Sequence, residues 1–189
     1  MIHKLIPRTT HPVLRSRREV AQHYLGDLIY GANDGIVTTF AVVAGVAGAR
    51  LSIAVVLILG LSNLLADGFS MAASNYLAIR SRSSAEFENN GSISEPYAVR
   101  HGVATFVAFV IAGSFPLLAY LIPFAGPHHF SVAAWVAALA LFTIGASRSL
   151  VASGSWWKNG LEMLTIGGTA GMVSYFVGVL VSRWIGSAA

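Results

Sequence analysis

Two aspartates stand within the most hydrophobic stretches of the chain. Asp34 lies in GANDGIVTTF (residues 31–40), and Asp67 lies in LLADGFSMAASNYL (residues 64–77). On insertion scales an ionised aspartate at the centre of a membrane helix costs about 2.5–3.5 kcal/mol, so intramembrane carboxylates normally face a bundle interior or a water-filled cavity and carry ions or protons. The pair therefore predicts a cation- or proton-binding site between helices. The alternative is that each is a neutral, hydrogen-bonded aspartate that only locks two helices together.

Helical spacing places further polar side chains beside each aspartate. The residues that share a face in the second stretch are Asn63, Asp67, Met71 and Ser74. Those that share a face in the first are Asp27, Gly31, Asp34 and Thr38. Carboxylates alone suit magnesium or calcium, whereas a thioether favours softer transition metals. We therefore expect a site for iron(II) or manganese(II), with the ligands Asp34, Asp67, Met71, Asn63 and Thr38.

The composition indicates which elements position these residues. Of the 189 residues, 55% are hydrophobic and only 11% are charged, whereas a soluble domain averages about 25% charged residues. The chain has no cysteine, which excludes disulfides, zinc–thiolate sites, iron–sulfur clusters and cysteine nucleophiles. These features predict an all-α membrane protein.

Five segments are long and apolar enough to cross a membrane, which takes about 20 residues each. We predict spans at 24–49, 51–79, 99–124, 132–152 and 161–185, within a membrane domain of residues 24–186 that follows a basic arm of residues 1–23. Asp-Gly pairs are also turn signals. Turns at the two aspartates would leave the flanking spans too short to cross, so we expect continuous helix there.

The distribution of lysine and arginine predicts the orientation, because cytoplasmic flanks carry the excess of positive charge. With the N-terminus inside, the cytoplasmic side holds ten such residues: Lys4, Arg8, Arg15, Arg17, Arg18, Arg80, Arg82, Arg100, Arg148 and Lys158. The outer side holds only Arg50 and Arg183. We therefore predict N-inside and C-outside. This distribution also explains the net charge of +4 without a nucleic-acid partner.

Both aspartates are predicted to lie near the middle of the membrane. A helix rises 1.5 Å per residue, so Asp34 lies about 15 Å beyond Tyr24, and Asp67 lies about 20 Å before Arg80. The hydrocarbon core is about 30 Å thick. Consecutive antiparallel helices usually pack side by side. We therefore expect the two carboxylates to face each other.

Two pairs of glycines have the GxxxG spacing that lets helices approach closely. They are Gly31 with Gly35 and Gly167 with Gly171. Such pairs occur at dimer interfaces and also within single bundles. The sequence leaves both possibilities open.

Long stretches of the chain resemble the vacuolar iron transporter family. They are GANDGIVTTFAVVAGVAGA (31–49), GLSNLLADGFSMAASNYLAIRS (60–81), ATFVAFVIAGSFPLLAY (104–120) and GLEMLTIGGTAGMVSYFVGVL (160–180). The resemblance implies a five-helix homodimer that exports ferrous iron, and often manganese, from the cytosol in exchange for protons. It matches the family's intramembrane aspartate to Asp34 and its pore methionine to Met71. It suggests a short bacterial member in the cytoplasmic membrane.

The chain departs from this family at several places. Many members carry a glutamate near Asn63 and another at Asn75, and iron-loading members have a Glu-rich helical domain between spans two and three. Here only residues 80–100 remain, which we interpret as a solvated loop. Its carboxylates, Glu86, Glu88 and Glu95, are weaker candidates for attracting metal at the cytoplasmic mouth.

Three histidines lie at or near the ends of the predicted spans. His128 and His129 are expected to be interfacial or solvated rather than metal ligands, and His101 lies near the cytoplasmic face without an assigned role. An intramembrane aspartyl protease pairs two carboxylates that share a proton, but its Gly-x-Gly-Asp motif is missing. A non-transporting scaffold is the other alternative. We expect no enzymatic activity and no cofactor, with metal and protons as the transported ions.

Overall fold

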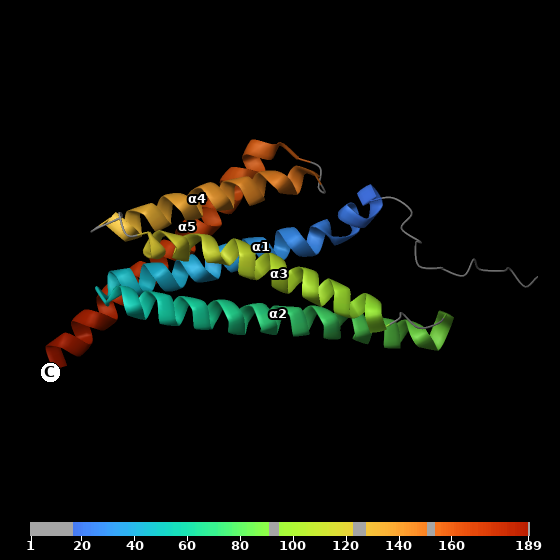
Figure 1. The fold of residues 1–189 in the computed structure, drawn as a ribbon, viewed down its shortest axis with the longest axis horizontal. Helices are drawn as coiled ribbons and strands as arrows, with labels where there is room; N and C mark the ends of the chain where they lie inside the picture. The colour runs from blue at the N-terminus through green and yellow to red at the C-terminus, as the bar shows by residue number, and fades with distance from the viewer. Residues whose placement is uncertain (1–16, 91–94, 123–127, 151–153, 189) are drawn as a thin grey trace, which may run out of the picture.

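The computed structural model describes residues 17–90, 95–122, 128–150 and 154–188, with only the backbone for 17–23, 82–90, 95–97 and 187–188. The elements are α1 (Arg17–Gly48), α2 (Ile53–Asn90), α3 (Glu95–Leu121), α4 (His129–Ser147), the short 3₁₀ helix η2 (Arg148–Leu150) and α5 (Trp156–Ala188). Figure 1 shows the long helices running along one another. All five are long and apolar enough to cross a membrane. The prediction of five spans in an all-α membrane protein is confirmed.

The ends of several helices differ by a few residues from the approximate spans predicted. The third helix ends at Leu121 rather than at 124, because the residue before a proline disfavours helical backbone and Pro123 follows Ile122. The fourth helix begins at His129 rather than at 132, and the fifth begins at Trp156 rather than at 161. Apolar residue content locates a span but does not mark its capping turns.

The prediction of a solvated loop over residues 80–100 was also wrong for most of that segment. The backbone of α2 stays helical to Asn90, and α3 begins at Glu95. Alanine and glutamate are good helix formers, and the sequence SSAEFENN continues the helix beyond the apolar residues. Glu86, Glu88 and Glu95 therefore lie on helical backbone, and their side chains are outside the described part of the chain.

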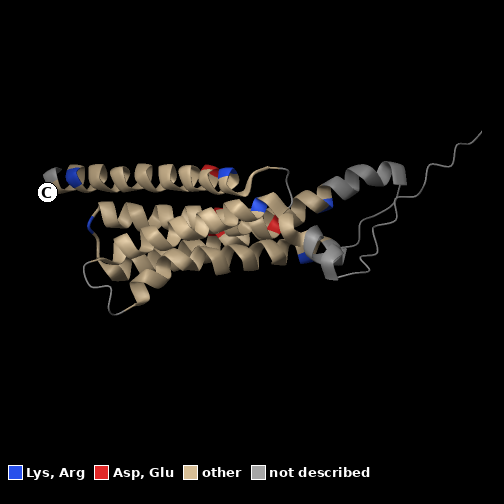
Figure 2. Cartoon of the chain, turned by 90° about the horizontal axis from the view of Figure 1, so that it is seen from above, with Lys and Arg blue, Asp and Glu red and all other residues tan. Residues whose placement is uncertain are grey.

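The third helix holds the first two together. Both α1 and α2 pack more extensively against α3 than against each other, and α1 also contacts α4 and α5. The expected contact between α1 and α2 exists, but it is the smaller one. In the view of Figure 2, α5 forms an outer layer, and the few charged positions gather in one half of the bundle, with isolated Lys or Arg at the opposite end. The bundle is thus built around α1 and α3.

Glycines on α1 allow these helices to approach closely. A Cβ at Gly31 would lie 2.6 Å from the carbonyl oxygen of Thr105, and a Cβ at Gly35 would overlap the carbonyl oxygen of Phe109. On α5, a Cβ at Gly167 or Gly171 would overlap the side chains of Leu141 on α4 and Phe40 on α1, respectively. Both GxxxG pairs therefore serve packing within one chain, which settles the question that the sequence left open.

We expect Gly35→Ala to destabilise the protein because its new methyl group overlaps the α3 backbone. Overpacking typically costs about 1–3 kcal/mol, which should lower the midpoint of thermal unfolding in detergent. Gly26→Ala is the matched control on the same helix, since no atom lies within 4 Å of a Cβ at that position. Equal midpoints for the two variants would contradict this account of α1–α3 packing.

Candidate metal-binding site

Asp34 and Asp67 lie at one level of the bundle because their helices pack on the same residue of α3. Each aspartate is followed by a glycine within continuous helix, so neither Asp-Gly pair forms a turn. The Cβ position of Gly35 meets the Phe109 backbone, and that of Gly68 lies 3.2 Å from the Phe109 ring. Phe109 itself is fully buried. The two carboxylates are half-buried and near enough to interact electrostatically. Their depth in a membrane stays a prediction.

The other predicted ligands surround this pair in different ways. The Asn63 amide donates a hydrogen bond to Asp67 Oδ2 at 2.8 Å and so fixes the orientation of that carboxylate. The Thr38 hydroxyl donates to the backbone carbonyl of Asp34 at 2.8 Å, which leaves its oxygen lone pairs as the only groups it can offer to a metal. Met71 is half-buried and packs against the hydrophobic cluster that contains Phe109.

One copy of the chain supplies a small number of charged ligands. Among the residues that the structure describes, no three His, Cys, Asp or Glu side chains lie close enough together to hold a metal ion. Structural transition-metal sites in proteins commonly have four ligands, and octahedral oxygen sites have six. A metal held by Asp34 and Asp67 therefore needs additional ligands from neutral groups, water or a second chain.

The two histidines at the start of α4 differ in their surroundings. His129 Nδ1 lies 2.9 Å from the carbonyl oxygen of Ala119, so this ring nitrogen donates a hydrogen bond to it. Its ring stacks on Tyr120 with 5.5 Å between the centroids. His128 is exposed at the start of α4. That the pair is interfacial or solvated rather than metal-binding stays a prediction.

A polar cluster that the sequence did not predict lies between α1, α2 and α3. His101 Nδ1 contacts Asp27 Oδ2, and the Asn75 amide donates to Asp27 Oδ1 at 3.1 Å and to Thr105 Oγ1 at 2.8 Å. The sequence did carry a signal, because Asp27 and His101 each stand about one turn inside a predicted span at the same end. Asn75, where the resemblance implies glutamate in many relatives, thus donates hydrogen bonds that join α2 to α1 and α3.

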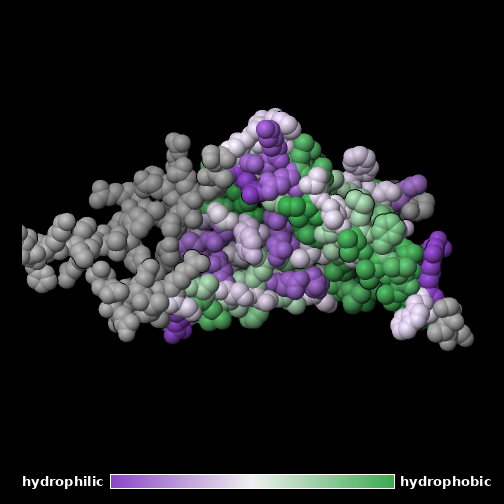
Figure 3. Space-filling model, turned by 180° about the vertical axis from the view of Figure 1, so that it is seen from behind, coloured by the Kyte–Doolittle hydropathy of each residue, from purple (hydrophilic) through white to green (hydrophobic). Residues whose placement is uncertain are grey.

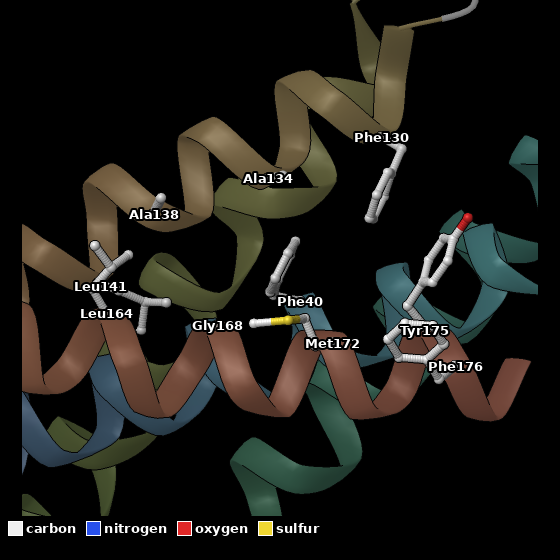
Figure 4. A pocket seen from close by; sticks show the side chains of 11 residues that line it. Phe40, Phe130, Ala134, Ala138, Leu141, Leu164, Gly168, Met172, Tyr175 and Phe176 are labelled. Carbon is white, nitrogen blue, oxygen red and sulfur yellow. The ribbon is translucent and has the colours of Figure 1, made fainter.

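An apolar cavity lies elsewhere in the bundle and does not suit a metal. It has a volume of about 450 Å³ and is bounded by α1, α4 and α5. Figure 4 shows the rings of Phe40, Phe130 and Tyr175 around it, with the Met172 side chain across from Phe40. Its walls are almost entirely hydrocarbon, so we assign no ion-binding role to it.

Comparison with known proteins gives consistent matches along the chain. Residues 25–92 and 85–179 match the model of the VIT family. A vacuolar iron transporter of Toxoplasma gondii is 26% identical over 87% of this chain and 76% of its own length. Vacuolar iron transporter homolog 1 of Arabidopsis thaliana is 28% identical over 81% of this chain and 80% of its own length. A vacuolar iron transporter of Plasmodium berghei is 41% identical over 35% of this chain and 28% of its own length.

We expect Asn75→Asp to destabilise the protein more than Asn75→Ala. The alanine variant loses the hydrogen bonds to Asp27 and Thr105, at a cost of about 1–3 kcal/mol. The aspartate variant also places a second carboxylate beside Asp27, and like charges at one site repel. Thermal unfolding in detergent should show that the extra cost shrinks as the pH falls, because protonation removes the repulsion. A difference between the two variants that does not change with pH would contradict the assignment of Asp27 as the acceptor.

Proposed function

The chain belongs to the VIT family, and on this basis we propose that it is a membrane transporter that moves a divalent transition metal, iron(II) or manganese(II), out of the cytosol in exchange for protons. Five membrane-spanning helices make it an integral membrane protein. Relatives named vacuolar iron transporter support iron as the cargo. The observation that carries the proposal is the pair Asp34 and Asp67, held at one level on two helices that both pack against Phe109.

The two carboxylates suit exchange of one metal ion for protons. Two ionised aspartates carry a charge of −2, which either one divalent cation or two protons neutralise. The site is therefore neutral in both loaded states, and this lowers the cost of charge in the membrane. Met71 adds the thioether that favours a transition metal over magnesium or calcium. Asn63 holds Asp67 in place through their hydrogen bond.

In the transport cycle, metal enters from the cytoplasmic end, where Glu86, Glu88 and Glu95 attract cations. It sheds most of its water and binds Asp34, Asp67 and Met71, with the oxygens of Asn63 and Thr38 beside them. Protons from the outer side then compete for the carboxylates and release the metal outward. We place this protein in a bacterial cytoplasmic membrane, whereas the relatives named above are eukaryotic.

We further propose that two copies of the chain form a homodimer that covers this site. Half-exposed carboxylates would otherwise face lipid, which polar groups in a membrane avoid by facing protein or water. Figure 3 shows hydrophilic side chains gathered on one face of the single chain, next to strongly hydrophobic ones. A row of small exposed residues runs along α2 at four-residue spacing: Ser62, Ala66, Ser70 and Ser74. Such rows allow close helix pairing, and a second copy would double the number of carboxylates available to the metal.

Asp34→Asn should abolish metal flux and leave a folded, membrane-inserted protein. Losing a group that merely orients a metal ligand typically costs about 10–100-fold in affinity, so replacing a ligand should lower flux by at least about tenfold. The measurement is uptake of iron(II) and manganese(II) into proteoliposomes under an imposed pH gradient, with Gly26→Ala as the control. Normal flux in Asp34→Asn would contradict the assigned site. A wild-type protein inert to every divalent metal would instead support the scaffold alternative.

The dimer proposal can be tested with a single introduced thiol, because the chain has no cysteine. Ser70→Cys, a nearly isosteric change on the small-residue row, should give a covalent dimer when membranes are treated with a mild oxidant or a short bifunctional maleimide. Thr143→Cys is the control, since Thr143 is exposed on α4, a helix whose main contacts are with α5, α3 and α1. Cross-linking of the control alone would place the interface on another face, and the absence of any dimer would contradict the proposal.

A further inference from the structure

Two hollows meet along α5. The apolar cavity between α1, α4 and α5 has a volume of about 450 Å³. A second hollow of about 420 Å³ lies between the end of α1 and the last turns of α5. Tyr175 and Phe176 line both of them. One ligand that reaches past these two rings would therefore occupy both hollows.

The second hollow is basic. It is lined by Arg50, which follows α1, and by Ser182 and Arg183 of α5, and none of the described residues that line it is acidic. Both arginines are exposed, and neither guanidinium has a hydrogen bond or ion pair with the described part of the chain. Guanidinium groups bind phosphate through paired N–H donors. The hollow therefore suits a phosphate group.

The backbone of Arg50 gives independent evidence that its side chain has a use. Arg50 has a φ of 57°, in the left-handed region. Its amide donates to the carbonyl of Ala47 at 3.0 Å, and the amide of Leu51 donates to that of Val46 at 3.1 Å, so this turn closes the end of α1. Glycine is the usual residue at such a position, because a Cβ is disfavoured there. Arginine is a costly choice for this backbone, which points to a function of the guanidinium.

The apolar cavity lies at the distance from these arginines at which a lipid has its acyl chains. Phe176, where the hollows meet, precedes Arg183 by seven residues, which is about 10 Å along α5. Trp184 is 75% exposed, and tryptophan on a spanning helix is typical of the headgroup level. The headgroup region is about 5–8 Å thick on each side of a membrane. A lipid with its phosphate at the arginines thus has its chains beside Phe176 and the cavity.

The cavity also has room for such a chain. Figure 4 shows Gly168 on the side of α5 that borders it, between the side chains of Leu164 and Met172. A Cβ at Gly168 would have no atom within 4 Å. The volume is within the range of about 300–1,000 Å³ that ligand sites have, and hydrocarbon walls within a membrane suit hydrocarbon rather than water.

From these observations we propose that the two hollows bind one anionic phospholipid, with its phosphate at Arg50 and Arg183 and one acyl chain in the apolar cavity. A headgroup with a net negative charge, such as that of phosphatidylglycerol, fits better than a zwitterionic one, because two guanidinium groups repel the cation that a zwitterionic headgroup carries. The lipid contacts the end of α1, α4 and α5 at once, so it stabilises their packing.

The test combines native mass spectrometry with thermal unfolding of the purified protein in a neutral detergent. Phosphatidylglycerol or phosphatidylcholine with the same acyl chains is added. Wild-type protein should retain one phosphatidylglycerol per chain and unfold at a higher temperature with it, because a ligand that binds only the folded state stabilises that state. Phosphatidylcholine should have neither effect.

Two arginine variants test the phosphate position. Arg183→Gln should lower retention of phosphatidylglycerol about fivefold, which is the effect of one basic residue at a lipid surface. Arg50→Gly should do the same, and without lipid it should unfold at about the wild-type temperature, since glycine suits that backbone. Arg148→Gln is the charge control and should retain the lipid, because Arg148 lies in a separate hollow beside Glu162.

A glycine variant tests the acyl-chain position. Gly168→Leu places a side chain in the cavity and should remove the effect of phosphatidylglycerol. Gly186→Leu is its control, at an equally open position on α5 that lines neither hollow, and should keep the effect.

Several results would overturn the proposal. They are equal retention of the two lipids or of neither by wild-type protein, and wild-type retention by both arginine variants. A midpoint raised as much by soluble glycerol phosphate as by phosphatidylglycerol would show a phosphate site that takes no lipid. A dimer that dissociates in Gly168→Leu would show that a second copy of the chain covers this face instead.

Discussion

The structure depends on the close approach of α1 and α2 to the same buried residue of α3. Gly35 leaves room for the Phe109 backbone, and Gly68 leaves room for its ring. Because each glycine directly follows an aspartate, this single contact level sets the depth of both carboxylates. A helix interior is rigid over one residue, so Asp34 and Asp67 cannot shift along the membrane independently of α3. Steric packing of hydrocarbon and backbone thus positions the charged groups.

Charge in the membrane interior is costly. The three aspartates between α1, α2 and α3, which are Asp27, Asp34 and Asp67, are only half-buried, and two of them accept hydrogen bonds. Asp67 accepts a hydrogen bond from Asn63, and Asp27 accepts from Asn75 and contacts His101. Asp34 is half-buried and near enough to Asp67 for the two carboxylates to interact electrostatically. Two acidic side chains held close together favour a cation between them.

The two places where the chain departs from its relatives have a common physical explanation. The resemblance implies glutamate near Asn63 and at Asn75 in many members. In this chain both positions are amides that donate a hydrogen bond to an aspartate. Asn63 donates to Asp67 at 2.8 Å, and Asn75 donates to Asp27 at 3.1 Å. An amide removes one negative charge and orients the carboxylate that remains. Both positions therefore stay polar without carrying a charge of their own.

The sequence by itself determined the five spans, the matching depth of the two aspartates and the face shared by Asn63, Asp67 and Met71. These features follow from hydrophobicity, helical period and rise per residue, which are properties of single helices. Only the tertiary structure decided that α3 lies against both α1 and α2, that the GxxxG pairs pack within one chain, and that Asn75 and His101 meet Asp27. The partners in that cluster are 48 and 74 residues apart. Contacts at such separation depend on how whole helices rotate and pack, which local patterns do not specify.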